Sequence, residues 1–407
     1  MEQIFFHIDV NSAFLSWTAL QLLEEGSEID LRLVPSIIGG DSEKRHGVVL
    51  AKSVPAKAYD IITGEPVVNA YRKFPGLVMA APDHDMYERR SKQFVSYLYS
   101  LCPDIEQASI DECYMDFTGI AHLYPSPEAA AEIIKDEVYK RFGFTVNVGI
   151  SDKKVLAKMA SDFKKPNLVH TLYTHEIQTK MWPLPVSSLY MCGKSSVQAL
   201  RNLGILTIGD LATFDLNILK SHLKSHGTTL WEYANGIDNS KITTEHSRPK
   251  GIGNSTTLSK DVVTKEEACK VLLSLSESVG QRLRHSKQQA TVVCTEIKYS
   301  DFRTASHQTV LPTPTASDEQ IYQTAVTLFD ELWDLSPIRL LGIRTSKLVQ
   351  AGEPVQLTLF DAPQQTISPK REKLDAALDS IRTKYGHNAI MRGSLLSSPK
   401  SKTQKDS

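Results

Sequence analysis

The feature that most constrains this chain is a pair of adjacent carboxylates, Asp111 and Glu112, within the stretch EQASIDECYMDF at residues 106–117. The flanking residues alternate in polarity, which predicts a β-strand with one buried face. Neighbouring strand residues point to opposite faces, so two adjacent carboxylates converge only at a strand end or a tight turn. Their repulsion favours a hard divalent cation such as Mg²⁺ there. For this pair alone, an acidic turn in water is the simpler interpretation.

A third carboxylate changes that balance. Residues 4–11 read IFFHIDVN, an apolar run that is too short for a helix and ends near Asp9. The run predicts a buried strand that carries Asp9 at its tip. Three acids at strand ends can hold two metal ions for phosphoryl or nucleotidyl transfer.

The residues around these acids also resemble a known family. DVNSAF at 9–14 and SIDECYMD at 109–116 are similar to the two metal-binding motifs of the Y-family, lesion-bypass DNA polymerases. The resemblance implies that Asp9, Asp111 and Glu112 are catalytic and bind two Mg²⁺ ions together with the Val10 carbonyl. It implies low-fidelity, template-directed translesion DNA synthesis from dNTPs onto a primer 3′-hydroxyl, in DNA repair and damage tolerance.

The resemblance also implies nucleotide-binding side chains. Phe14 corresponds to an aromatic gate that packs under the nucleotide sugar and rejects a 2′-hydroxyl. Ala13 departs from the many relatives that carry a second aromatic residue there. A purely structural alternative is that Phe14 belongs to the core.

Two lysines correspond to residues that contact the triphosphate. Lys57, in AKSVPAKAY at 51–59, falls where relatives carry arginine, and Val54 falls where they usually carry tyrosine. Lys165 is the final lysine of the family segment AKMASDFKKPN at 157–167. Without the resemblance, such lysines would be interpreted as solvated surface residues.

The predicted order of elements, together with the resemblance, indicates an α+β, multidomain right-hand polymerase. Two strand–helix–strand passes around the acidic hairpin predict a ferredoxin-like palm, and residues 251–348 repeat the β-α-β-β-α-β order. The expected domains are a palm (1–30 and 76–165), small fingers (31–75), a helical thumb with helix-hairpin-helix units (166–240), a βαββαβ little finger (245–348) and a flexible tail (349–407).

Three local expectations concern helices and strands. Ser12 is expected to cap a helix that ends at Gly26. Residues 31–34 are expected to form a short strand. A helix that follows Ser151 is expected to expose a polar side rich in lysine, including Lys154 and Lys158, as a positive patch.

Charge gives little information about DNA binding at the level of the whole chain. The chain has 46 basic and 47 acidic residues, so a nucleic-acid binder must concentrate its positive charge locally. Basic residues in or beside the strands of the expected little finger are candidate contacts to DNA phosphates. They are Arg248, Lys250, Lys298, Arg303, Arg344 and Lys347.

The C-terminal region carries a short peptide that resembles a partner-binding motif. The peptide QLTLF at 356–360 resembles the bacterial sliding-clamp-binding motif, which implies that Gln356, Leu357, Leu359 and Phe360 bind the clamp β subunit. The alternative is an ordinary edge strand. Residues 370–384 are expected to form a basic amphipathic helix.

The remaining features indicate where the protein works. Five cysteines without a Cys-x-x-Cys pair suggest reduced thiols. No signal peptide or membrane-spanning apolar run is evident, so we expect a cytoplasmic protein. We also expect a monomer, and the resemblance implies that it acts on primer-template DNA and dNTPs.

Two other functions fit parts of the chain. Departures such as Ala13 and Val54 are compatible with a catalytically weak DNA- and clamp-binding accessory protein of the same fold. A palm-fold nucleotide cyclase would use the acids, but it would not need the thumb, the little finger or the clamp peptide.

Overall fold

The computed structural model describes residues 3–40, 47–244, 249–351, 369–386, 389–390 and 392–393. Arg248 and the peptide at 356–360 lie outside the described residues. Within them, the chain divides into two compact units, residues 3–244 and residues from 249 onward.

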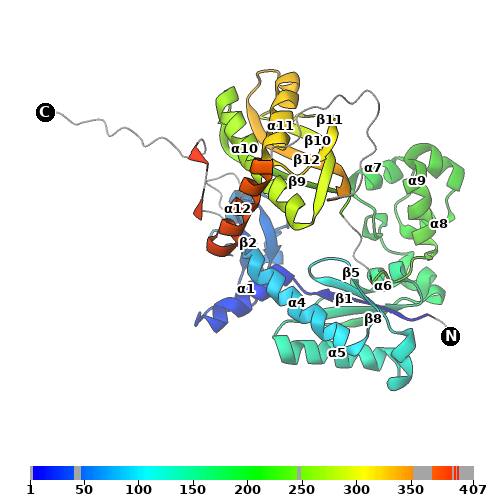
Figure 1. The fold of residues 1–407 in the computed structure, drawn as a ribbon. Coiled ribbons are helices and arrows are strands. Elements are labelled where there is room, and N and C mark those ends of the chain that lie inside the picture. The colour runs from blue at the N-terminus through cyan, green and yellow to red at the C-terminus, as the bar shows by residue number, and fades with distance from the viewer. Residues whose placement is uncertain are drawn as a thin grey trace. The chain divides into compact units, whose positions relative to one another are not determined.

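The first unit contains most of the helices and two sheets (Figure 1). Its elements are β1 (Phe5–Val10), α1 (Ala13–Glu24), β2 (Ser36–Gly39), β3 (Val49–Lys52), α2 (Val54–Lys57), α3 (Val67–Lys73), β4 (Val78–Ala80), α4 (His84–Leu101), β5 (Ile105–Gln107), β6 (Glu112–Asp116), α5 (Pro127–Phe142), β7 (Val146–Ser151), α6 (Lys154–Ser161), β8 (Val169–Thr171), α7 (Lys194–Asn202), α8 (Ile208–Thr213) and α9 (Leu216–Ala234).

The central sheet of this unit has the strand order β5-β6-β1-β7-β8. β1 pairs antiparallel with both β6 and β7, so it lies inside the sheet. All six of its residues are buried, because helices cover both faces of a central strand. The first four strands of this order, joined through α4 and α5, form the expected ferredoxin-like arrangement.

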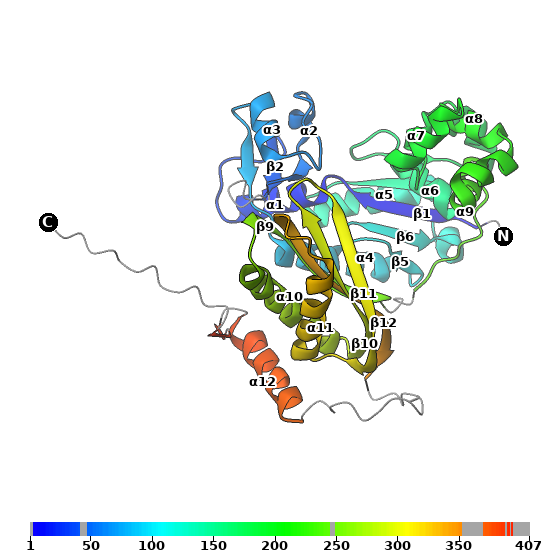
Figure 2. The same ribbon diagram turned by 90° about the horizontal axis from the view of Figure 1, so that it is seen from above.

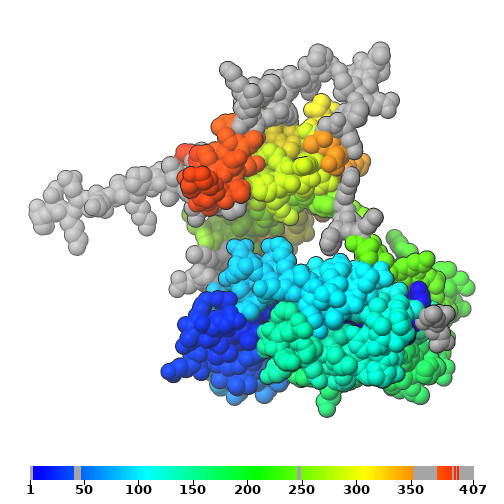
Figure 3. Space-filling view, turned by 60° about the horizontal axis from the view of Figure 1, so that its bottom comes forward, coloured from blue at the N-terminus to red at the C-terminus, as the bar shows by residue number. Residues whose placement is uncertain are grey.

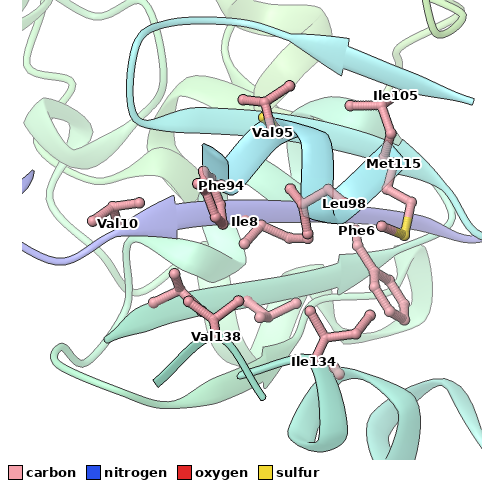
Figure 4. Close-up of a cluster of buried hydrophobic side chains, with 14 of the residues drawn as sticks. Phe6, Ile8, Val10, Phe94, Val95, Leu98, Ile105, Met115, Ile134 and Val138 are labelled. Atoms are coloured by element: carbon pink, nitrogen blue, oxygen red, sulfur yellow. The ribbon is translucent and has the colours of Figure 1, made fainter. Parts of the chain in front are cut away.

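The core on one face of the sheet is apolar. Phe6, Ile8 and Val10 point from alternate positions of β1 toward the helices, and Phe94 of α4 and Val138 of α5 meet them (Figure 4). In the space-filling view, α4 and α5 form the outer surface over this face of the sheet (Figure 3).

The opposite face carries the polar residues of β1. His7 and Asp9 alternate with the apolar set and face the side on which α6 packs across β1 and β7. Close approach of α6 requires Gly149 of β7, because a Cβ there would collide with the Ala157 carbonyl and the Ser161 amide. This packing brings the side chains of α6 to the end of β1.

Two local expectations were wrong. Ser12 adopts a left-handed conformation with φ of 48° and makes no side-chain cap to α1. Its backbone carbonyl accepts from the Ser16 amide instead. Residues 31–34 form turns, and the strand begins at Ser36, in a three-stranded sheet of order β3-β2-β4. Here backbone hydrogen bonding overrides local β propensity.

The second unit consists of one four-stranded sheet with helices on one face (Figure 2). Its elements are β9 (Gly251–Val262), α10 (Lys265–His285), β10 (Gln288–Tyr299), β11 (Thr304–Thr315), α11 (Asp318–Leu332), β12 (Ile338–Gln350) and α12 (Pro369–Tyr385). The β-α-β-β-α-β order of β9 to β12 agrees with the expectation. The strand order β11-β10-β12-β9 differs from that of the first sheet.

The helix α12 packs within this unit by its charged side. Asp379 accepts from Arg284 of α10, and Arg382 donates to Glu277 of α10 at 2.8 Å. Leu374 and Ile381 are exposed instead. The expected helix therefore exists, but ion pairs and not apolar burial hold it.

Two further observations concern the chain as a whole. No helix among the described residues is long and apolar enough to span a membrane. All five cysteines are free thiols.

Candidate active site

The three predicted acids meet at one end of the central sheet. Asp9 and Glu112 are direct partners across the antiparallel pair β1–β6, so their side chains leave the same face of the sheet. Asp111 lies in the turn immediately before β6, and its carbonyl accepts from the Val10 amide at 3.0 Å. The turn lets two adjacent carboxylates lie near one site.

These acids line a cavity of about 430 Å³. All seven residues proposed for metal or nucleotide binding line it, namely Asp9, Val10, Phe14, Lys57, Asp111, Glu112 and Lys165. The other lining residues are Ser12, Ala13, Leu50, Ala51, Lys52, Thr63 and Asp162. Residues from β1, α1, β3, α2, the acidic hairpin and the segment after α6 thus share one cavity.

Two lysines make ion pairs with the acids. Lys158 of α6 donates to Glu112 Oε1 at 2.7 Å and lies 3.4 Å from Asp9 Oδ2. Lys165 lies 3.0 Å from the same Asp9 oxygen. Both ammonium groups also contact Asp162, at 3.2 and 2.9 Å. The acids are therefore partly neutralised by cations of the chain itself.

The burial of these groups shifts their pKa values. Burial raises the pKa of Glu112, and the hydrogen bond and charge of Lys158 only partly oppose that rise. Burial alone would lower the pKa of Lys158, but its bond to Glu112 and the charges of Asp9 and Asp162 raise it overall. Lys158 is therefore a permanent cation at neutral pH.

His7 lies beneath the acids and is fully buried. The Ser161 hydroxyl donates to the Lys158 carbonyl, so Nδ1 of His7 donates to Ser161 Oγ at 2.8 Å. Nε2 lies 3.9 Å from Glu112 Oε2 and has no hydrogen-bond partner within the described part of the chain. Burial and the two lysines hold the pKa of His7 well below its usual value, so the ring is neutral.

The donor set fits hard divalent cations, which bind carboxylate and carbonyl oxygens. Within the described ranges, however, no three His, Cys, Asp or Glu side chains converge into a ready-made metal cage. Lys158 bridges Asp9 and Glu112, and Asp111 accepts from the Ser109 hydroxyl at 2.7 Å. The expected metal ligands therefore lie at one site, and their carboxylate oxygens accept hydrogen bonds from ammonium and hydroxyl groups of the chain.

Phe14 both lines the cavity and joins the core. It lies in the first turn of α1, half-buried, and packs against two apolar clusters of the first unit. The ring of Phe14 is therefore supported by the packed side chains behind it. Ala13 is buried next to it.

The finger residues reach the cavity from β3 and α2. Lys52 and Lys57 both line it, and Lys52 also donates to the Ile61 carbonyl. Burial, followed by the charge of Lys57, lowers the pKa of Lys52. Val54 is 55% exposed and is not among the cavity residues. The cations that this part of the chain brings to the cavity are therefore Lys52 and Lys57.

Sequence reasoning missed some of these residues. The expectation that Lys154 and Lys158 form an exposed positive patch was wrong, because both are buried and paired with acids. Asp162 was not predicted as a site residue, yet it contacts two of the lysines, Lys158 and Lys165. Their i, i+4 and i, i+3 spacing from Asp162 was the available signal.

The predicted DNA-contacting residues of the second unit have different environments. Lys298 of β10 and Arg344 of β12 occupy the sheet face opposite α10 and α11, since the alternate positions Ile297 and Ile343 belong to the core. Lys250 and Lys347 are exposed at the strand ends.

Arg303 differs from them because it pairs with Asp301 at 2.8 Å and with Asp334 at 3.2 Å. These acids compete with any phosphate. The open face of the sheet also has a hollow lined by Gly251, Gly253 and Gly342, where backbone groups are accessible beside Arg344.

Comparisons with known proteins agree with this geometry. Residues 8–162 match the impB/mucB/samB family, and residues 249–359 match the impB/mucB/samB family C-terminal domain. DNA polymerase IV of Clostridium acetobutylicum is 50% identical over 396 residues, which cover 97% of this chain and 99% of that protein. DNA polymerase IV 1 of Bacillus subtilis is 34% identical, with 99% and 95% of the two chains covered.

The fold has a solved counterpart as well. The Y-family DNA polymerase chimera Dbh-Dpo4(243-245)-Dbh superposes with a TM-score of 0.72 at 21% identity, over 85% of this chain and 99% of that chain. The α+β right-hand polymerase fold expected from the sequence is thereby confirmed. The chain belongs to the impB/mucB/samB family and is a Y-family DNA polymerase of the polymerase IV type.

Proposed function

We propose that this chain performs template-directed translesion DNA synthesis at the cavity formed by β1, α1, the acidic hairpin and the fingers. The observation that carries the proposal is the shared lining of that cavity by Asp9, Asp111, Glu112, Phe14 and Lys165. A triphosphate, its sugar and a primer 3′-hydroxyl need carboxylate, aromatic and ammonium groups within reach of one another, and this cavity offers all three.

Asp9, Asp111, Glu112 and the Val10 carbonyl are proposed to hold two Mg²⁺ ions. Bound there, the ions would lower the pKa of the primer 3′-hydroxyl and neutralise charge on the triphosphate and the pyrophosphate. The side chains hold the reacting groups in position, which supplies much of the barrier reduction in such reactions.

The chain's own cations are proposed to bind the triphosphate. Lys165 can exchange its bond to Asp9 Oδ2, at 3.0 Å, for a phosphate oxygen. Lys57 lines the same cavity from α2. Phe14 would pack under the sugar and exclude a 2′-hydroxyl by its bulk. Lysine binds phosphate as a point charge, without the bidentate geometry of arginine.

The expected domains are proposed to divide the remaining work. The fingers (31–75) and palm (1–30 and 76–165) bind the nucleotide, and the thumb (166–240) contacts the phosphate backbone. The little finger (245–348) offers Lys250, Lys298, Arg344 and Lys347, while Arg303 is held by two acids. We further propose a cytoplasmic monomer whose Gln356–Phe360 peptide binds the sliding-clamp β subunit.

Primer extension tests the proposal. Wild-type protein with Mg²⁺, primed template and four dNTPs should extend the primer, and Asp111→Ala should abolish extension while DNA binding stays intact. Asp104→Ala is the matched control, because Asp104 lies exposed at the base of the same hairpin. Undiminished extension by Asp111→Ala would contradict the proposal. An inactive wild type that still binds DNA would favour the accessory-protein alternative.

A further inference from the structure

Lys158 has an unusual position for a lysine beside a metal site. Its side chain is 9% exposed, yet its ammonium group contacts three carboxylates, of Glu112, Asp9 and Asp162. A buried charge is stable only when it is paired and hydrogen-bonded. These contacts make Lys158 the most highly connected cation among the described residues of the cavity region.

The position of Lys158 is set by the fold and not by solvent. The helix α6 packs closely on β1 and β7 at Gly149, which directs Lys158 toward the strand ends that carry Asp9 and Glu112. Asp162 follows α6 and remains half-exposed. It therefore offers both lysines a partner that does not lie on the sheet.

The charges at the site are unequal. Four residues are acidic, namely Asp9, Asp111, Glu112 and Asp162. The cations Lys158 and Lys165 contact all of these acids except Asp111, and His7 is neutral. Removal of the Lys158 charge would leave the facing pair Asp9 and Glu112 with Lys165 alone. Like charges on directly opposed strand positions repel each other.

We propose that Lys158 is the resident counter-ion of the metal-free site. Its ammonium group neutralises the charges of Asp9 and Glu112, as divalent cations do when they bind. When the cations replace Lys158 at these two acids, Asp162 remains as its ion-pair partner. This inference rests on the proposed metal-binding role of the three acids. It makes Lys158 a positioning residue that keeps the ligands together between catalytic cycles.

The proposal predicts that the lysine and the metal substitute for each other. Lys158→Met should lower the melting temperature strongly in EDTA and much less in millimolar MnCl₂. The rise produced by Mn²⁺ should exceed that of the wild type by about 3 °C. The Mn²⁺ affinity of the variant, measured by electron paramagnetic resonance, should be about tenfold tighter, because a nearby positive charge is lost.

Lys154→Met is the matched control. Lys154 lies one turn earlier on α6, is 8% exposed, and donates at 2.7 Å to Glu106, which is not one of the three acids. Its loss should lower the melting temperature equally with and without Mn²⁺. If Lys158→Met behaves in the same way, Lys158 is an ordinary structural lysine and the inference is wrong. Weaker Mn²⁺ binding by Lys158→Met would contradict it as well.

Asp162→Asn provides a second test that does not remove a buried group. Without Asp162, both lysines keep only the metal ligands as partners, so Mn²⁺ should bind more weakly and raise the melting temperature less than in the wild type. Unchanged Mn²⁺ binding in this variant would contradict the proposal.

Failure of the metal site itself would look different. If wild-type protein shows no Mn²⁺-induced rise, or if Asp111→Ala retains the full rise, the proposed metal-binding function is wrong. If the wild type responds and Asp111→Ala does not, the metal site stands. The Lys158 and Asp162 variants then decide the inference alone.

Discussion

The ring of Phe14 stacks on the ring of Tyr87, with centroids 4.6 Å apart and planes inclined by 19°. Tyr87 is fully buried, and its hydroxyl lies 2.8 Å from the Thr18 hydroxyl. The side of Phe14 that faces the cavity is therefore backed by a rigid aromatic group. A steric gate needs such support, because a ring that yields cannot reject a single extra hydroxyl group.

The first prediction concerns sugar selection. Phe14→Ala should raise ribonucleotide incorporation by about tenfold or more, because the bulk beneath the sugar is lost. Since Phe14 is half-buried, the free energy of unfolding should fall by about 2 kcal/mol, less than for a fully buried phenylalanine. Tyr87→Leu should relax sugar selection to an intermediate degree. Rates of single-nucleotide insertion of rNTP and dNTP measure the sugar discrimination of both variants. Unchanged discrimination in Phe14→Ala would exclude a steric gate at this position.

The second prediction concerns the approach of α6 to the sheet. Gly149→Ala should destabilise the first unit by about 3 kcal/mol, because its Cβ would overlap the backbone of Ala157 and Ser161. It should also reduce primer extension, since α6 carries Lys158. Gly119→Ala is the control, because nothing lies within 4 Å of a Cβ at that position. Chemical denaturation compares the two variants, and equal stability would show that α6 can move away at little cost.

The third prediction concerns pH in the second unit. Burial raises the pKa of Asp318 to about 6, although the Arg284 hydrogen bond and charge oppose this rise. The native state then binds a proton more tightly than the unfolded chain. The stabilisation from this group is complete below the ordinary pKa of about 4 and is lost as pH rises through about 6.

Asp318→Asn removes that titration. The free energy of unfolding of the variant minus that of the wild type should therefore increase by about 2 kcal/mol from pH 4 to pH 7. Urea unfolding at a series of pH values measures this difference. Asp330→Asn, in an exposed ion pair with Lys265, should show little pH-dependent difference. Parallel curves for wild type and Asp318→Asn would contradict the prediction.

The fourth prediction concerns clamp binding. The combined Leu359→Ala and Phe360→Ala substitutions should abolish clamp-stimulated synthesis and clamp pull-down, because apolar anchors carry most of the affinity of short peptides. Unassisted extension and the melting temperature should stay unchanged. Thr358→Ala, immediately before the two anchors in the sequence, is the control. If clamp stimulation survives the double substitution, the peptide does not bind the clamp and the alternative of an ordinary edge strand is favoured.

Local pattern alone determined much of this protein. The apolar run ending at Asp9 predicted β1, and alternation around Glu112 predicted β6, since both signals depend on side-chain direction along a single strand. The β-α-β-β-α-β order of residues 251–348 followed from the same kind of signal. The three acids and Phe14 came from short motifs that keep their residues adjacent in the chain.

Only the tertiary structure decided what lies against those residues. The pair Lys158 and Glu112 is separated by 46 residues, and the pair Lys165 and Asp9 by 156. Both contacts depend on the packing of α6 over β1 and β7, which no local periodicity encodes. The same packing buried Lys158, whose sequence context resembles a solvated helix face. Burial depends on long-range packing, which a local sequence pattern does not contain. The sequence therefore indicated the three acids, and only the tertiary structure showed which lysines pair with them.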